Sequence, residues 1–268
     1  DAAAFEAAPE DLDAMRDAGI RRVRAYRYVC GIPVEHPVVG DAETLAAQYA
    51  SLVGAKLGRN SHEPENPGLP DDVYRLAAKG ASECSLYQGS GVTAASAVDG
   101  WMDDSDATNV EKLGHRRWIL DPTMRVTGFG LSDGATERFV AMHTRESGKA
   151  QPSDLVFIPY PARGWMPIDM FGSQHAWSVT VDPAASQRFG MAGARARVRR
   201  LSEDFVPDES ELSVEMIGTR VDTRYGGRCV WIFRPAKVDV TDGAAYLAEV
   251  SVVDPKSKKS TTVLRWIT

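Results

Sequence analysis

The feature that most constrains this chain is a change of sequence pattern near residue 150. Before it, apolar residues recur every three or four positions over long stretches, which is typical of amphipathic helices. After it, short β-branched and aromatic runs alternate with Gly, Pro and Asp, which is typical of strands joined by turns. A chain of 268 residues is long enough for two domains. We therefore predict one domain over residues 1–148 and a second over residues 149–268.

The first domain is predicted to contain four helices and two strands. Gly31 and Pro33 end the opening helix, and Asp41 is a good N-cap for the next one. The turn at Asp133-Gly134 separates the two strands. The expected helices cover residues 9–30, 41–58, 70–78 and 92–104, and the expected strands cover residues 126–131 and 138–144.

The second domain is predicted to be all-β and sandwich-like. Seven short runs with turn residues between them favour two packed sheets of an immunoglobulin-like kind. The Cys-Trp-Cys arrangement of true immunoglobulin domains is missing, so the strand topology stays open. The expected strands cover residues 155–159, 176–182, 194–201, 212–218, 229–233, 245–253 and 261–267. The fold class of the whole chain is α+β.

Composition and charge argue against several classes of protein. A net charge of -6 and a pI near 5.5 disfavour nucleic-acid binding, which requires clustered Lys and Arg. No apolar run approaches the ~18 residues of a membrane-spanning helix, so we expect no membrane span. The three cysteines Cys30, Cys84 and Cys229 cannot all pair within one chain, although Cys30 could pair with Cys84.

Several motifs resemble a known extracellular family. The stretch Gly114-His-Arg-Arg-Trp-Ile-Leu-Asp-Pro122, followed by Gly128-Phe-Gly130, resembles the second histidine motif of bacterial CAP domains. This is the family of cysteine-rich secretory proteins, antigen 5 and pathogenesis-related 1. Four further segments resemble CAP elements in the family's order, over about 120 residues: Arg24–Pro33, Gln48–Leu57, Asn60-Ser-His62 and Val98–Asp104. The resemblance implies an α-β-α sandwich in a secreted or cell-envelope protein.

The resemblance also implies a cleft in which two histidines meet two carboxylates. His62 and His115 match the family's histidines, and Asp104 matches the acidic position that follows Trp101, where Glu is more common. Glu83 resembles the Glu of the family's Gly-Glu-Asn element, but this chain has Ser82 in place of Gly and Cys84 in place of Asn.

The four cleft residues are chemically suited to a divalent metal ion. Imidazole and carboxylate groups are ligands for Zn²⁺, so His62 and His115, supplemented by Glu83 and Asp104, could hold Zn²⁺ or another divalent cation. Such an ion could activate a water molecule for hydrolysis. The alternative is that the same side chains close loops over the core by hydrogen bonds.

Other nucleophiles and charged residues near the motifs have competing interpretations. Cys84 could be a reactive thiolate or a small buried thiol. A serine nucleophile lacks the Gly-x-Ser-x-Gly elbow, although three serines lie near the motifs. We interpret Arg116, Arg117 and Asp121 as ion-paired anchors of the turn after His115. The serines are Ser61, Ser82 and Ser85, and the histidines without an assigned role are His36, His143 and His175.

Three classes of function are consistent with these features. The first is a binding module for a small ligand, a lipid or a component of the cell envelope. The second is a metal-dependent hydrolase of peptide or glycan, with Glu83 or Asp104 as general base. The third is an adhesion or scaffold protein with a vestigial cleft. The segment Ile158–Ile168 resembles a β-rich module that accompanies some bacterial CAP domains, but it implies no function.

Overall fold

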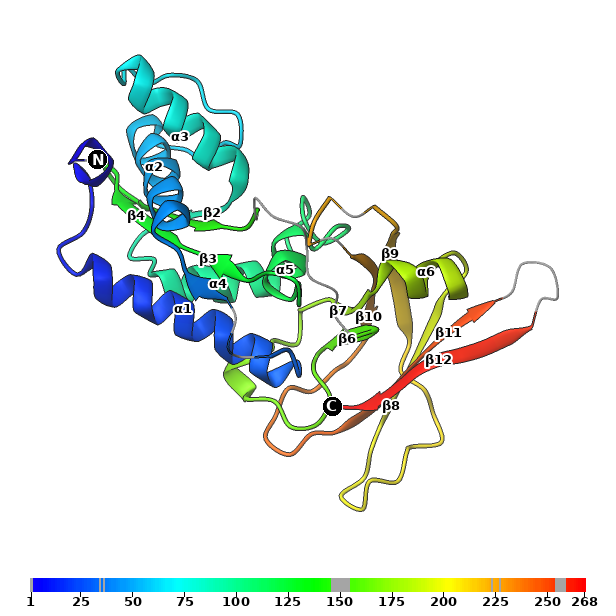
Figure 1. The fold of residues 1–268 in the computed structure, drawn as a ribbon. Coiled ribbons are helices and arrows are strands. Elements are labelled where there is room, and N and C mark those ends of the chain that lie inside the picture. Colours follow the sequence, from blue (N-terminus) through cyan, green and yellow to red (C-terminus); the bar gives the residue numbers. More distant parts are fainter. Residues whose placement is uncertain are drawn as a thin grey trace. The chain divides into compact units, whose positions relative to one another are not determined.

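The computed structural model describes residues 2–33, 35, 37–145, 155–222, 224–226, 228–253 and 259–268 (Figure 1). The chain divides into two compact units that are interleaved along the sequence. The first unit comprises Asp1–Ala25, Pro33–Met102 and Thr123–Gln151, and the second comprises Tyr26–Ile32, Asp103–Pro122 and Pro152–Thr268. The predicted boundary between residues 148 and 149 lies outside the described residues.

An antiparallel sheet forms the middle of the first unit. Its strands β2 (Cys84–Gly89), β5 (Arg138–His143) and β4 (Phe129–Asp133) are paired in the order β2-β5-β4. A short parallel pair, β1 (Val38–Val39) with β3 (Val126–Thr127), lies outside this sheet. The centre of the sheet is apolar, because β5 carries the buried residues Phe139 to Met142. The sheet therefore has two buried faces that helices must cover.

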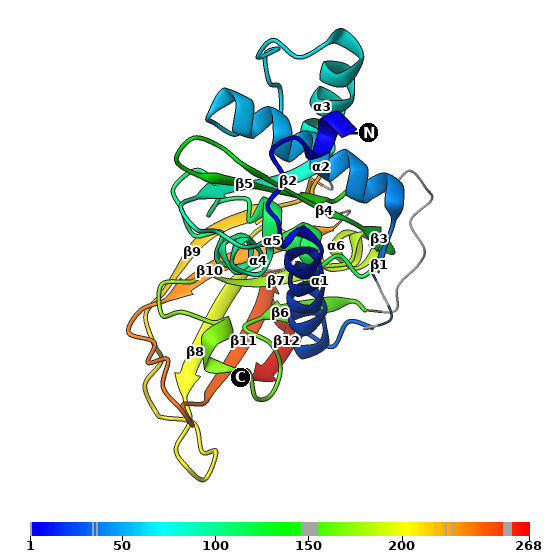
Figure 2. The ribbon, with the colours of Figure 1, turned by 90° about the vertical axis from the view of Figure 1, so that its left-hand side faces the viewer.

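Helices pack on both faces of this sheet (Figures 1 and 2). On one face lie α2 (Asp41–Leu57) and α3 (Asp71–Glu83). On the other lie the parts of α1 (Leu12–Val29) and α4 (Ala94–Asp103) that belong to this unit. The ring of Trp101 in α4 lies 6.4 Å, centroid to centroid, from that of Phe129 in β4. The unit is an α-β-α sandwich, as the sequence predicts.

Close backbone contacts explain the glycines of the Gly128-Phe-Gly130 motif. A Cβ atom on Gly130 would lie 2.2 Å from the carbonyl carbon and oxygen of Ala47 in α2. One on Gly128 would lie 2.3 Å from the backbone nitrogen of Thr44. Real Cβ atoms do not approach backbone atoms so closely, so α2 can lie on β4 only because these residues have no side chain.

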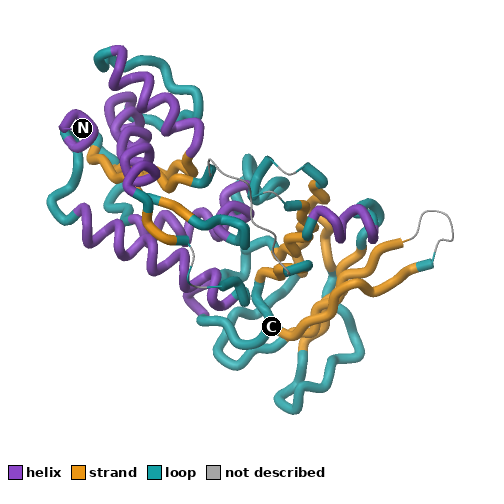
Figure 3. The backbone as a smooth tube through the Cα atoms, viewed as in Figure 1, coloured by secondary structure: helices purple, strands orange, loops and turns teal. Residues whose placement is uncertain are grey.

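The β-rich part of the second unit contains two antiparallel sheets, drawn as orange strands in Figure 3. All seven strands predicted from the sequence are present, with ends shifted by a few residues. The strands of the first sheet, in spatial order, are β6 (Phe157–Tyr160), β7 (Trp177–Val181), β10 (Cys229–Pro235) and β9 (Val214–Arg220). The strands of the second are β12 (Ser260–Ile267), β11 (Tyr246–Val253) and β8 (Arg195–Arg200).

Aromatic side chains join these two sheets into a sandwich. The ring of Trp177 in β7 lies 6.1 Å from that of Tyr246 in β11, and Phe233 in β10 lies 6.5 Å from Trp266 in β12. All four rings are buried, and each such pair adds about 0.5–1.5 kcal/mol to the burial of its apolar area. The region is therefore β-rich and sandwich-like, as predicted.

The structure also contains elements that the sequence analysis did not predict. The third helix continues to Glu83, five residues beyond the predicted end at residue 78, and leads directly into β2. The helix α5 (Gly114–Ile119) is a single short segment, and α6 (Pro183–Phe189) interrupts the β-rich region. Asp182 caps α6 by accepting hydrogen bonds from the backbone nitrogens of Ala184 and Ala185.

All three cysteines are free thiols, so the Cys30–Cys84 disulfide considered from the sequence is absent.

In the part of the chain that the structure describes, no helix combines the length and the apolar character of a transmembrane span.

Candidate functional site

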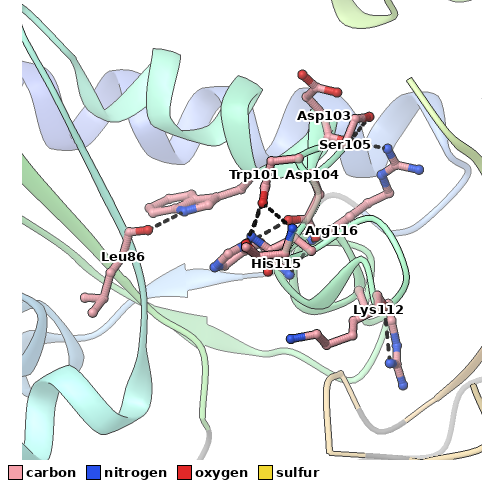
Figure 4. Close-up of polar contacts among 12 residues, drawn as sticks. Leu86, Trp101, Asp103, Asp104, Ser105, Lys112, His115 and Arg116 are labelled. Carbon is pink, nitrogen blue, oxygen red and sulfur yellow. Dashed lines mark hydrogen bonds and ion pairs between the residues drawn. The ribbon is translucent and has the colours of Figure 1, made fainter. Parts of the chain in front are cut away.

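His115 and Asp104 form a close pair in the second unit (Figure 4). The Asp104 side chain is 1% exposed, and its Oδ1 atom lies 2.8 Å from the Nδ1 atom of His115. Its Oδ2 atom accepts a hydrogen bond from the backbone nitrogen of His115 at 3.0 Å. A carboxylate facing Nδ1 favours the tautomer with a proton on that atom. The His115 side chain is 22% exposed.

Two left-handed residues shape the loop that brings this pair together. Asp104 follows directly after α4 and has a φ of 47°, and Leu113, the residue before α5, has the same value. Positive φ is uncommon for residues other than glycine, although Asp tolerates it better than most. The short helix α5 thus starts where Asp104 can bind the backbone of its first turn.

Two buried arginines fix α5 to the β-rich part of its unit. Arg116 donates to the carbonyl oxygens of Ala176 and Asp103 at 2.7 and 2.6 Å, and its guanidinium lies 4.6 Å from the centroid of the Tyr160 ring. Arg117 donates to the carbonyl of Asp222 at 2.6 Å. The sequence analysis predicted ion pairs that anchor the turn after His115. These bonds of Arg116 and Arg117 run to backbone carbonyls instead, and Arg117 also lies 4.0 Å from the Asp222 carboxylate.

His62 is held in the first unit by the end of α3. Its Nδ1 atom lies 2.8 Å from the carbonyl oxygen of Ala81, so Nδ1 carries the proton and donates. The loop on which it lies is tied to α3 a second time, because the Tyr74 hydroxyl donates to the carbonyl of Pro64. His62 is exposed, and its Nε2 atom is the nitrogen left for other partners.

Glu83 lies beside a histidine that the sequence analysis left without a role. The Oε2 atom of Glu83 is 3.7 Å from the Nε2 atom of His143, and both residues belong to the first unit. The His143 side chain is 7% exposed, and its Nδ1 atom is buried without a hydrogen-bond partner. Burial lowers the pKa of His143, and the charge of Glu83 opposes this shift. The imidazole is thus neutral at pH 7.

This pair borders a cavity of about 410 Å³ between α2, α3 and the end of β5. The cavity has apolar walls that include Leu45, Tyr49 and Leu76. Charged residues of both signs line it too, namely Glu43, Lys79, Glu83 and Arg145. A hint of the site was present in the sequence: His143 follows four consecutive apolar residues of its strand, so its burial could have been expected.

The nucleophiles considered from the sequence are not activated. Cys84 is 3% exposed, and burial raises the pKa of its thiol, an effect that the neighbouring Glu83 increases. Burial also raises the pKa of Cys30 to about 12. The reactive-thiolate interpretation of Cys84 is therefore wrong, because a nucleophilic cysteine requires a lowered pKa. Ser82 and Ser61 use their hydroxyls in local turns, with the Lys79 carbonyl and the Glu63 nitrogen respectively.

No metal centre is seen among the described residues. Zinc sites commonly use three or more protein ligands. Among the described residues, no group of three or more His, Cys, Asp and Glu side chains is arranged to hold a metal ion. Asp104 uses both of its oxygens on His115, which fits a carboxylate that orients a histidine rather than one that binds the metal itself. Zinc binding stays a prediction from the resemblance.

Among the four cleft candidates, Asp104 and His115 are joined in the second unit. In the first unit, His62 bonds to the Ala81 carbonyl and Glu83 lies beside His143. The convergence of all four in one cleft stays a prediction. His36 lies outside the described residues.

Comparison with known proteins identifies the segment that carries these pairs. Residues 40–143 match the model of CAP, the cysteine-rich secretory protein family. The match includes all four cleft candidates and every strand of the sheet β2-β5-β4. A comparison with curated proteins found no match. The chain therefore contains a CAP domain, to which residues 40–143 belong.

Proposed function

We propose that the CAP domain is a binding module for a small ligand, a lipid or an envelope component, in a protein that is secreted or held at the cell envelope. The observation that supports this proposal is the cavity of about 410 Å³ beside Glu83 and His143, inside the segment that matches the family. Pockets for small molecules typically enclose roughly 300–1,000 Å³. The volume is therefore sufficient for one small ligand.

The lining indicates an amphiphilic ligand. Leu45, Tyr49 and Leu76 offer an apolar wall, and the Leu76 side chain is 48% exposed. Glu83 and His143 lie at the same cavity as a polar pair. A ligand with an alkyl chain and a polar head group would match both parts of this lining.

Three probes with the same alkyl chain test which polar group the cavity accepts. Octanoate, octanol and octylamine would be titrated calorimetrically into the full chain. We expect at least one of them to bind, and the order of their affinities gives the preferred head group. Failure of all three, together with native mass spectra that show no bound species in protein purified from its own producing cells, would contradict the proposal.

A matched pair of variants locates the binding. Leu76→Trp places an indole at the cavity wall, whereas Arg75→Trp places the same ring on the neighbouring exposed residue of α3, which does not line the cavity. We expect Leu76→Trp to weaken binding about tenfold or more, since a filled pocket loses most of the contact area of its ligand. Arg75→Trp should bind like the unmodified chain, and equal affinities of the two variants would place the ligand elsewhere.

The location of the protein is supported by the family match alone. Fractionation of the producing cells into cytoplasm, envelope and medium, followed by immunoblotting, tests it. Recovery in the cytoplasm alone would contradict this part of the proposal.

One observation favours hydrolysis as a second candidate function. A histidine whose Nδ1 atom faces a buried carboxylate is an arrangement used by general bases. Asp104 and His115 have it. Turnover in peptide and glycan libraries that is lost in His115→Ala and kept in His143→Ala would support this function. Libraries that show no turnover leave binding as the activity to pursue.

The predicted divalent cation is tested separately by zinc calorimetry. If His62 and His115 both bind the ion, His62→Ala and His115→Ala each abolish the binding heat. Unchanged heat in both variants would exclude these ligands. If neither the alkyl-chain probes nor zinc bind to the chain, the adhesion or scaffold role is the function that stays open.

A further inference from the structure

A second cavity lies in the β-rich part of the second unit, and none of the four cleft candidates lines it. It has a volume of about 240 Å³ and is lined by residues of two loops and by Thr268, which follows β12. The first loop, residues 161–176, joins β6 to β7 and is bonded to β12 through the Gly164 nitrogen and the Ile267 carbonyl, 2.8 Å apart. The second loop, residues 236–245, joins β10 to β11.

Four aromatic side chains line this cavity. Trp177, Tyr246 and Phe171 are buried, whereas Trp165 is 68% exposed. Its ring contacts that of Phe205, edge to face, with the centroids 6.2 Å apart. A tryptophan with most of its surface in water contributes little to the core, so its ring is accessible to a ligand of the cavity.

The charges of the lining are all of one sign. Asp239 and Asp242 line the cavity, and no Lys, Arg or His is among the lining residues that the structure describes. Asp239 is paired with Arg200, whose Nη1 atom lies 2.7 Å from its Oδ2 atom. Asp242 is exposed and makes no ion pair or side-chain hydrogen bond with the described residues. The cavity thus presents aromatic rings and one unpaired carboxylate.

We propose that this cavity binds the alkylammonium group of a small organic cation. The faces of Trp and Tyr rings attract cations, and the best-known sites for quaternary ammonium groups are aromatic cages. The unpaired carboxylate of Asp242 complements the same charge, whereas an anionic ligand would be repelled by it. A volume of about 240 Å³ is below that of most drug-sized sites and suits a compact head group.

The proposal concerns a different unit from the CAP cavity and does not depend on its ligand. It gives the β-rich region an activity of its own, recognition of a cationic small molecule. Since Trp165 and Asp242 are exposed, their substitution should change the free energy of unfolding little. Differences between the variants will then report on ligand affinity.

Choline and dimethylbutanol, in which a carbon atom replaces the choline nitrogen, are the matched probes. Both are titrated into the full chain by calorimetry, with tryptophan fluorescence as a second readout. We expect choline to bind and dimethylbutanol to bind about tenfold more weakly, as cation–π attraction in a partly desolvated site implies. Equal affinities, or no choline binding at all, would overturn the proposal.

Variants assign the binding to named residues. Trp165→Leu should weaken choline binding about fivefold to tenfold, with most of the affinity restored in Trp165→Phe. Asp242→Asn should weaken it about threefold at low salt and less at high salt, because exposed charges are screened. Asp208→Asn removes an exposed carboxylate outside the cavity and should have no effect. Choline affinities that are the same in all four variants and the unmodified chain would place choline elsewhere and refute the assignment.

Discussion

Substitution of Gly130 by alanine tests the close contact between β4 and α2 on which the CAP sandwich depends. The added Cβ atom would lie 2.2 Å from the Ala47 carbonyl, whereas ordinary contact begins at 3.4 Å. Strand and helix would therefore have to separate by about 1.2 Å, which is 3.4 minus 2.2. Because the added Cβ atom would meet backbone atoms of α2, no side chain can rotate away to relieve the contact.

The expected cost lies at the upper end of the range for overpacked cores, about 3 kcal/mol. Alanine also lowers the conformational entropy of the unfolded chain, which offsets about 0.4–1 kcal/mol of this cost. The free energy of unfolding should thus fall by about 2–3 kcal/mol, which corresponds to a fall in melting temperature of about 5–10 °C.

The measurement is urea unfolding followed by circular dichroism, with calorimetric melting as a second assay. Gly89→Ala is the matched control, since Gly89 lies in β2 of the same sheet and its nearest neighbour would be the Val92 Cβ atom at 3.9 Å. The control should differ from the unmodified chain by less than about 1 kcal/mol. If Gly130→Ala unfolds at the same urea concentration as the control, the packing argument is refuted.

Three further predictions concern buried polar groups. Arg116→Met should lower the free energy of unfolding by about 3 kcal/mol in urea titrations, because the Ala176 and Asp103 carbonyls lose a charged donor; a change below about 1 kcal/mol would argue against the anchoring role. In the folded protein, Cys84 should react with a thiol reagent only at the rate of unfolding, and rapid labelling at pH 8 would show that its thiol is accessible. Burial lowers the pKa of His143 in the folded protein. Below about pH 6.5 its imidazole therefore binds a proton more readily in the unfolded chain than in the folded one. Stability should therefore fall between pH 7 and pH 5, and His143→Gln should show a smaller fall; equal slopes would contradict the burial of a neutral imidazole.

Local patterns were sufficient to predict much of the architecture. The periodicity of residues 12–29 and 41–57 located α1 and α2, and the short β-branched runs located seven strands of the β-rich region, because helix and strand formation respond to near neighbours. Elements with weak local signals were missed. β2 has the mixed sequence Cys-Ser-Leu-Tyr-Gln-Gly, and α5 is only six residues long. The Asp182-Pro183 signal that starts α6 was present but was not used.

The sequence by itself determined which chemical groups the chain carries and the types of element on which they lie. Only the tertiary structure decided which groups meet. The pairing of β2 with β5 places Cys84 opposite His143, and this register brings Glu83 to a histidine 60 positions away. Register and helix packing depend on burial across the whole unit, so residue spacing does not encode them. The same holds for Asp104, whose carboxylate orients His115 because the chain turns sharply on either side of residues 105–112.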